Sequence, residues 1–104
     1  MESREIDAAR AHIRAAVALV RGIEDDQEHM RAAHDVAAEM FSAASDLIGE
    51  RMAAANRLRD VDLDAWPYRE IATACGIVSD HLAQDGQAIV KGSPSRRRRK
   101  AADT

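Results

Sequence analysis

The chain has 104 residues, of which 46% are hydrophobic, 32% charged and only 3% aromatic, so it can form one small domain with appendages. Cys75 is the single cysteine, which excludes an internal disulfide and a zinc site built from cysteines. The net charge is −3, yet six basic residues lie in residues 91–104 against Asp103 alone, so residues 1–90 are acidic. No apolar run approaches the roughly 20 residues of a membrane span and no signal peptide is visible, so we expect a cytoplasmic protein without a membrane partner.

The composition predicts an all-α fold. Alanine dominates the apolar residues and is the best helix former, and the chain contains only five glycines and two prolines. Alanine buries little surface, so a chain of this size is short of core, and self-association is the usual remedy.

A first helix is expected from Ser3, a residue type that caps helices, to Gly22, which is placed to end one. Its apolar residues recur at alternating steps of three and four, as on one face of a helix. These residues are Ile6, Ala9, Ile13, Ala16, Val20 and Ile23.

A long second helix is expected from about residue 25 to 60, because this stretch holds no proline and only Gly49 among glycines. Its start carries three acidic residues, which suit the helix dipole. Its apolar pattern repeats every eleven residues, which keeps the stripe on one face of a nearly straight helix. The stripe comprises Met30, Ala33 and Ala37, then Phe41, Ala44 and Ile48, then Met52 and Ala55, with Arg59 in the last slot.

Two helices of unequal length cannot enclose this stripe alone. We therefore expect residues 1–62 to form a helical hairpin that pairs with a second hairpin across a two-fold axis, making a homodimer. The interface residues would be Ile13, Val20, Met30, Phe41, Ala44 and Ile48. The alternative is that the C-terminal segment folds back and covers the stripe.

Residues 63–91 are expected to form a second unit. Pro67 fits the first turn of a third helix that runs to about Cys75, and a fourth helix is expected from near Ser79 until Gly92 and Pro94 stop it. Trp66 is expected to cover the core of this unit. Residues 92–104 are basic and of low complexity, so we expect a disordered tail.

Residues 67–90, which include the stretch YREIATACGIVSDHL at residues 68–82, resemble the helix-turn-helix superfamily, particularly the tri-helical type of sigma-factor region 4 and of small bacterial regulators. The resemblance covers less than a quarter of the chain. It implies that Ile71 and Cys75 face the core, that Ala72 lies at a helix crossing, and that Gly76 takes a positive φ in the turn. Ile77 would fill the turn and Leu82 would anchor the next helix, with the C-terminal end of the second helix, around Met52, Ala55 and Leu58, completing three helices.

Two positions depart from this pattern. Val78 stands where a capping Ser or Thr is common, so Ser79 would cap one residue late. Asp85 stands where an apolar residue normally closes the back of the reading helix, a face that Gly86 and Ile89 can take over. The reading segment also holds two aspartates without a Lys or Arg before Lys91, which weakens phosphate binding.

The most specific hypothesis is a small dimeric DNA-binding protein, a transcriptional regulator associated with the nucleoid. Residues 79–87 would read the major groove, since Asp can accept from cytosine and Ser, His and Gln can reach base edges. The basic tail would grip phosphates or the minor groove. The candidate DNA-binding residues are Tyr68, Arg69, Ser79, Asp80, His81, Gln84, Lys91, Arg96, Arg97, Arg98, Arg99 and Lys100.

The runner-up hypothesis is a helical adaptor that binds RNA polymerase or another transcription protein through its alanine-lined stripe or the acidic surface of residues 60–85. No nucleophile stands beside a base, and no glycine loop for phosphate is visible, so we expect neither an enzyme nor a cofactor. Asp26 and His29 make one carboxylate–imidazole pair, too few ligands for a metal site. His12 and His81 are expected to be exposed, and Cys75 to be a small core residue.

Overall fold

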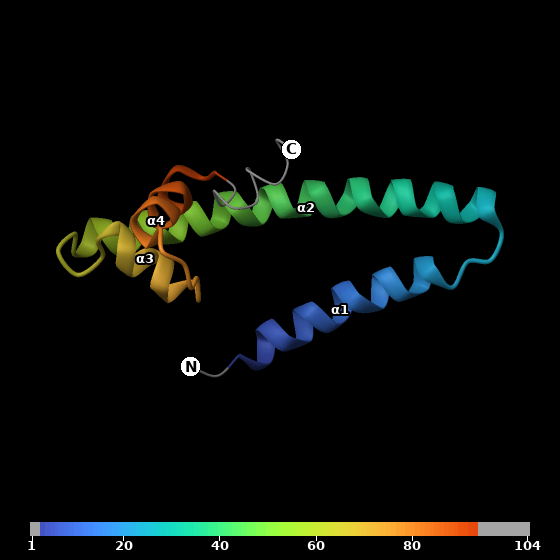
Figure 1. The fold of residues 1–104 in the computed structure, drawn as a ribbon, viewed down its shortest axis with the longest axis horizontal. Coiled ribbons are helices and arrows are strands. Elements are labelled where there is room, and N and C mark those ends of the chain that lie inside the picture. The colour runs from blue at the N-terminus through green and yellow to red at the C-terminus, as the bar shows by residue number, and fades with distance from the viewer. Residues whose placement is uncertain (1–2, 94–104) are drawn as a thin grey trace. The chain divides into compact units, whose positions relative to one another are not determined.

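The computed structural model describes residues 3–93, and within them the chain forms helices and no strand (Figure 1). The all-α expectation is therefore confirmed. The expected disorder of the tail, and the candidate residues Arg96, Arg97, Arg98, Arg99 and Lys100, fall outside the described residues. The helices are α1 (Arg4–Arg21), α2 (Asp26–Val61), α3 (Tyr68–Ala74) and α4 (Leu82–Lys91).

The chain divides into two compact units, Met1–Ser42 and Ala43–Thr104. The division lies inside α2, whereas the sequence suggested a boundary near residue 62. The C-terminal part of α2 therefore belongs with α3 and α4.

The first unit is a helical hairpin made of α1 and the beginning of α2. Helix α1 ends at Arg21, as expected, and the N–H of Gly22 bonds back to the carbonyl of Ala18. Asp25 caps α2, because its Oδ2 accepts the N–H of Glu28 at 2.9 Å. The half-buried side chains of the two helices define the faces that meet in the hairpin: Ala16, Val17 and Val20 on α1, and His29, Ala32, Val36 and Met40 on α2.

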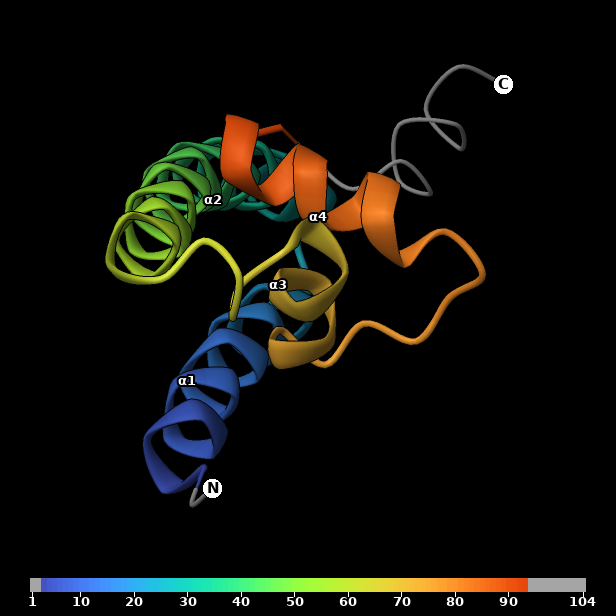
Figure 2. The ribbon, with the colours of Figure 1, turned by 90° about the vertical axis from the view of Figure 1, so that its left-hand side faces the viewer.

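The second unit packs α3 and α4 against the C-terminal part of α2 (Figure 2). Ala55 from α2, Ile71 from α3 and Ile89 from α4 are buried together, and Trp66, Ile77 and Val90 pack against them. Trp66 thus covers this core as expected. Over this part of α2, the C-terminal segment does fold back onto the apolar stripe.

Leu58 was expected to belong to this core and does not, since 40% of its surface is exposed. The reason is helical geometry. The covered face of α2 extends from Ala55 towards Asn56 and Arg59, which are half-buried, and Leu58 is turned about 60° from Ala55 in the opposite direction.

Polar side chains on α2 hold the end of α4. The amide of Asn56 donates to the carbonyl of Val90 at 3.0 Å and to Met52 at 2.9 Å in its own helix. The guanidinium of Arg51 donates to the carbonyl of Ser93 at 2.9 Å. The last carbonyls of a helix have no partner within that helix, so α2 stabilises the C-terminus of α4 from outside.

Candidate functional site

The α3–turn–α4 segment has the turn that the sequence predicted. Gly76 has a φ of +80°, the left-handed conformation that glycine adopts most readily. Its N–H donates to the carbonyl of Thr73, and the N–H of Ile77 donates to Ala72 at 3.1 Å. Figure 2 shows the chain leaving α3 in an extended connection before α4 begins.

Helices α3 and α4 approach each other closely at two small residues. Ala72 is 0% exposed at the crossing. Gly86 lies against the backbone of Tyr68, so close that a Cβ on residue 86 would come within 2.5 Å of the Tyr68 carbonyl carbon. Both Gly86 and Ile89 are buried, as the sequence suggested for the back of this helix.

The expected start of the fourth helix near Ser79 is wrong, because α4 begins at Leu82. The hydroxyl of Ser79 accepts the N–H of His81 at 2.9 Å, which forms a local turn in place of the first helical residues. The same hydroxyl donates to Oδ2 of Asp85 at 2.7 Å. Ser79 thus connects the turn to the buried side of α4.

Asp85 is only 6% exposed and points away from solvent. The exposed residues of α4 are consequently Ala83, Gln84 and Lys91, and Gln87 is half-buried. Because Asp85 is buried, the exposed side of α4 carries no carboxylate. Asp80 and His81 are exposed just before the helix. Of the two aspartates that the sequence placed on this surface, Asp80 alone remains there.

The start of α3 is shaped by a residue that the sequence did not single out for this role. Arg59 of α2 lies over the ring of Tyr68, with its Cζ 4.3 Å from the ring centroid, and donates to the carbonyl of Trp66 at 2.7 Å. Tyr68 is therefore half-buried under a cation, whereas its neighbour Arg69 is exposed. In the sequence, the only indication of this role was that Arg59 takes the last position of the eleven-residue apolar repeat of α2.

Cys75 was expected to face the core and is exposed instead. Helix α3 ends at Ala74, and Cys75 lies in the cap position, where its N–H bonds to the carbonyls of Ile71 and Ala72. Its side chain is carried out to the surface as the chain turns.

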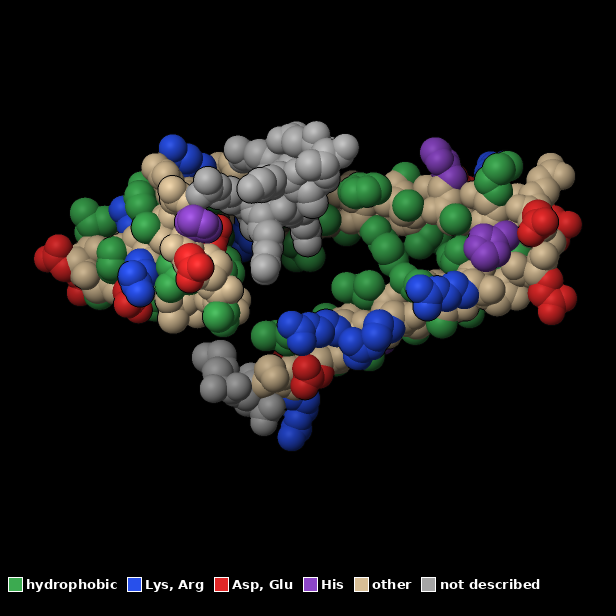
Figure 3. Space-filling view, viewed as in Figure 1, with side chains coloured by type: hydrophobic (Ala, Val, Ile, Leu, Met, Phe, Trp, Pro, Cys, Tyr) green, Lys and Arg blue, Asp and Glu red, His purple; other side chains and the backbone are tan. Residues whose placement is uncertain are grey.

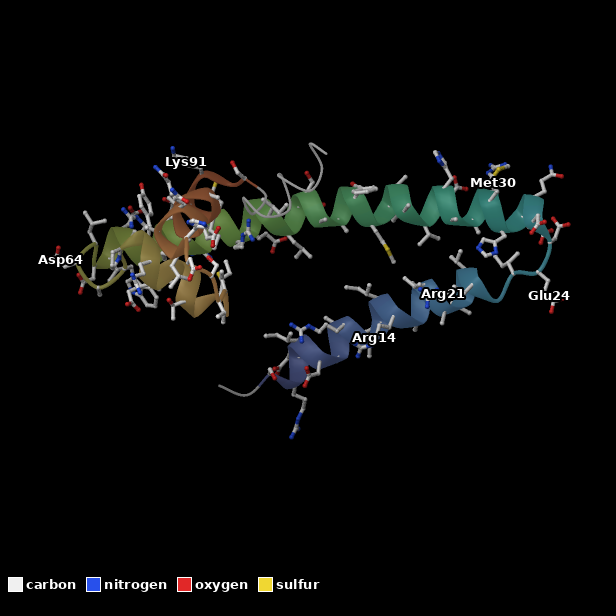
Figure 4. The ribbon with its side chains drawn as sticks, in the orientation of Figure 1. Arg14, Arg21, Glu24, Met30, Asp64 and Lys91 are labelled. Carbon is white, nitrogen blue, oxygen red and sulfur yellow. The ribbon has the colours of Figure 1, made fainter. Side chains whose placement is uncertain are left out.

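Asp80 and His81 lie directly before α4, Gln84 lies in its first turn, and Lys91, labelled in Figure 4, lies at the opposite end of that helix. Ser79 precedes these residues, and its hydroxyl is used in hydrogen bonds to His81 and Asp85. Of the residues expected at a dimer interface, Ile13, Met30 and Phe41 are exposed, and Val20, Ala44 and Ile48 are half-buried. Their role in self-association stays a prediction.

Among residues 3–93, no group of three or more potential metal ligands lies together, and no helix has the length and apolar character needed to cross a membrane. Comparison with protein-family models, with curated proteins and with solved structures gives no match. Function must therefore be proposed from the residues themselves.

Proposed function

We propose that this chain is a small DNA-binding protein, a transcriptional regulator that reads the major groove with α4 and the turn before it. The observation that carries the proposal is the inward position of Asp85. Because Asp85 points inwards, the exposed face of α4 carries small and amide side chains and ends in a lysine. Without a carboxylate on this face of the helix, it can approach phosphates and bases closely.

The chemistry of this face suits base readout. Gln84 and Gln87 carry amides, the group that bonds bidentately to the edge of adenine, and Asp80 can accept from cytosine. Arg69 and Lys91 are exposed cations on α3 and α4 that suit phosphate contacts, which set affinity and orientation without sequence information. The arginine-rich residues 96–100 would add further phosphate or minor-groove contacts.

Self-association through the hairpin would complete the proposal. A reading unit with so few cations binds DNA weakly alone, so two or more copies on neighbouring half-sites would supply the missing affinity. The simplest form is the homodimer expected from the sequence, with half-sites about one helical turn apart.

The experiment is a binding titration on a preferred duplex, selected from a random pool, and on random duplex across a series of salt concentrations. We expect log Kd to rise steeply with log salt concentration. Gln84→Ala should lose about 1–3 kcal/mol on the preferred duplex and little on random DNA, as expected for a lost base contact. Lys91→Ala should weaken both and reduce the salt slope by about 0.9.

Arg57→Ala is the matched control, because Arg57 is an exposed cation on α2 outside the proposed surface. It should change neither the preference nor, by more than a small amount, the affinity. If Lys91→Ala and Arg57→Ala weakened DNA binding equally, the position of the cation would not matter. That result would contradict a DNA interface at α4. The absence of binding to any duplex at low salt would refute the function.

A second candidate is supported by a different surface. At the end of α2 and just beyond it, Val61 and Leu63 are 87% and 59% exposed between Asp60, Asp62 and Asp64. Apolar side chains that alternate with carboxylates suit a basic, partly apolar protein partner, such as a component of the transcription machinery. If Leu63→Ser abolished function in cells while DNA binding stayed unchanged, this adaptor would be the better assignment.

A further inference from the structure

The hairpin of the first unit has two unlike faces, here called the front and the back. With about 100° of rotation per residue, Arg10, Arg14 and Arg21 form one row on α1, about a quarter turn from the side that meets α2. The front face consists of this arginine row and of an apolar row on α2. Figure 3 shows the basic side chains aligned along α1, and Figure 4 labels Arg14, Arg21 and Met30 on this side.

The apolar row of the front face is the N-terminal part of the eleven-residue stripe. Met30 and Phe41 are 69% and 75% exposed, and the small residues Ala33 and Ala37 lie between them. Among residues 3–42, α1 does not cover this row, because the half-buried face of α2 that meets α1 lies about a quarter turn away.

The back face carries the complementary arrangement. Glu28, Asp35 and Glu39 fall on one side of α2, about a quarter turn in the other direction from the face that meets α1. On α1 the back face carries Leu19, which is 77% exposed, with Ala15, His12 and Ala8 in the same row. In the front face the charged row is on α1 and the apolar row on α2, whereas in the back face the charged row is on α2 and most of the apolar residues are on α1.

The two charged rows share their overall length. Each row spans eleven residues, about 16.5 Å along a helix, but the arginines are separated by four and then seven residues and the carboxylates by seven and then four. Where the two helices run in the same direction, the outer members of the rows can therefore face each other, and the middle members are offset by about 4.5 Å. Because they lie on opposite faces, the rows cannot pair within one hairpin. Among the described residues, the ion pair formed is Arg31–Asp35 at 3.2 Å, so Asp35 of the carboxylate row already has a partner on its own helix, whereas Arg10, Arg14 and Arg21 take no part in this pair.

We infer that the occupant of the front face is the back face of a second copy of this chain. The second hairpin is turned by half a revolution about the normal to the faces, so that α1 of one copy lies along α2 of the next. Arginines then meet carboxylates, and Met30 and Phe41 meet the Leu19 side of α1. This inference rests on the self-association in the proposed function, and it replaces the two-fold homodimer named there by a front-to-back contact.

A front-to-back contact differs from the two-fold dimer in its consequence. When two copies associate, one of them keeps its front face free and the other keeps its back face free. Further copies can therefore add at both ends, and association does not close at two copies. A front-to-front dimer would instead place the arginine row against the same row or against an apolar row without carboxylates. The charge pattern therefore favours open-ended association, which would make DNA binding cooperative.

The test compares two charge-reversal variants of the full chain by sedimentation, without DNA, over a range of protein concentrations. The front variant is Arg10→Glu, Arg14→Glu and Arg21→Glu, and the back variant is Glu28→Lys, Asp35→Lys and Glu39→Lys. We expect the unmodified chain to grow in mean mass with concentration, and growth to diminish as salt screens the pairs. Each variant alone should remain monomeric, and an equal mixture of the two should assemble, because every contact in the mixture again joins opposite charges.

The matched control is Arg57→Glu, Arg69→Glu and Lys91→Glu, which makes the same change of charge at exposed basic residues of the second unit, outside both faces of the hairpin. It should assemble like the unmodified chain, and circular dichroism should show the same helix content in all variants. A mass that stops at two copies, a mixture that stays monomeric, or a control that is equally impaired would each overturn the inference. Should a variant lose its helix content, the salt dependence and limiting mass of the unmodified chain decide the matter.

The outcome for DNA is separate. If the front variant is monomeric and still binds random duplex, with lower affinity and without cooperativity, the proposed DNA-binding function stands. That conclusion does not depend on whether the mixture of the two variants assembles. A chain that assembles as described but binds no duplex would sustain the interface and refute the DNA-binding proposal.

Discussion

Replacing Gly86 with alanine reverses the effect that helix propensity predicts. Alanine is more stable than glycine inside a helix by about 1 kcal/mol, so propensity alone predicts a more stable protein. In the structure, however, the new Cβ would lie 2.9 Å from Cα and 2.5 Å from the carbonyl carbon of Tyr68, and closer still to its carbonyl oxygen. These are backbone atoms, which cannot move aside as the end of a flexible side chain can.

The loss of stability depends on which atoms must move to make room for the new Cβ. Overpacking of a core costs about 1–3 kcal/mol when neighbouring side chains adjust. Here α3 or α4 must move as a body, which disturbs the burial of Ala72 and Ile89, so the upper end of that range applies. After subtraction of the propensity gain, we expect Gly86→Ala to lower the free energy of unfolding by about 2 kcal/mol, or to lower Tm by roughly 10 °C.

Gly49→Ala provides the control, because a Cβ at residue 49 would meet nothing within 4 Å. This variant should gain up to about 1 kcal/mol, the propensity term alone. Both are measured by urea unfolding and thermal melts followed by circular dichroism. If Gly86→Ala proves as stable as Gly49→Ala, α3 and α4 do not cross as described.

Gly76→Val should lose about 1–3 kcal/mol in thermal unfolding, because a β-branched residue is strained at positive φ, and an unchanged Tm would contradict the turn. Ser79→Ala should lose about 1–3 kcal/mol in urea unfolding, because it leaves a buried carboxylate without its hydroxyl partner, whereas the exposed Thr73→Ala should stay within about 0.5 kcal/mol. Phe41→Glu should shift light scattering towards monomer, and a folded monomer already present in the unmodified chain at micromolar concentration would exclude self-association. Asp80→Ala should cost about 1–3 kcal/mol on the preferred duplex alone, and tighter binding to every duplex would show instead that Asp80 merely repels phosphate.

The helices could be predicted from the sequence because their limits depend on local residues. The long second helix was expected over residues 25–60 and runs from Asp26 to Val61, since nothing inside it breaks a helix. Gly76 and Gly92 both have the positive φ that ends or turns a chain at glycine. Gly22 ends α1 without it, at a φ of −78°.

The surface of the candidate site was harder to predict because it depends on individual hydrogen bonds. The hydroxyl of Ser79 decides that α4 begins at Leu82 and draws Asp85 inwards, and no periodicity in the sequence contains that information. The exposure of Cys75 follows from the end of α3 one residue earlier. The repeat of α2 likewise could not show that Ala55 is covered by α3 and α4 while Phe41 remains exposed.

The hydrogen bonds from Asn56 and Arg51 to the end of α4 have a practical consequence for protein engineering. The segment of residues 63–93 is not a transplantable cassette, because the carbonyls of Val90 and Ser93 would lose their donors in a foreign host. A chimera joined near residue 43, inside α2, would carry those donors with it. The same junction would let a designer exchange the N-terminal hairpin for an oligomerisation helix of known stoichiometry in continuous helical phase.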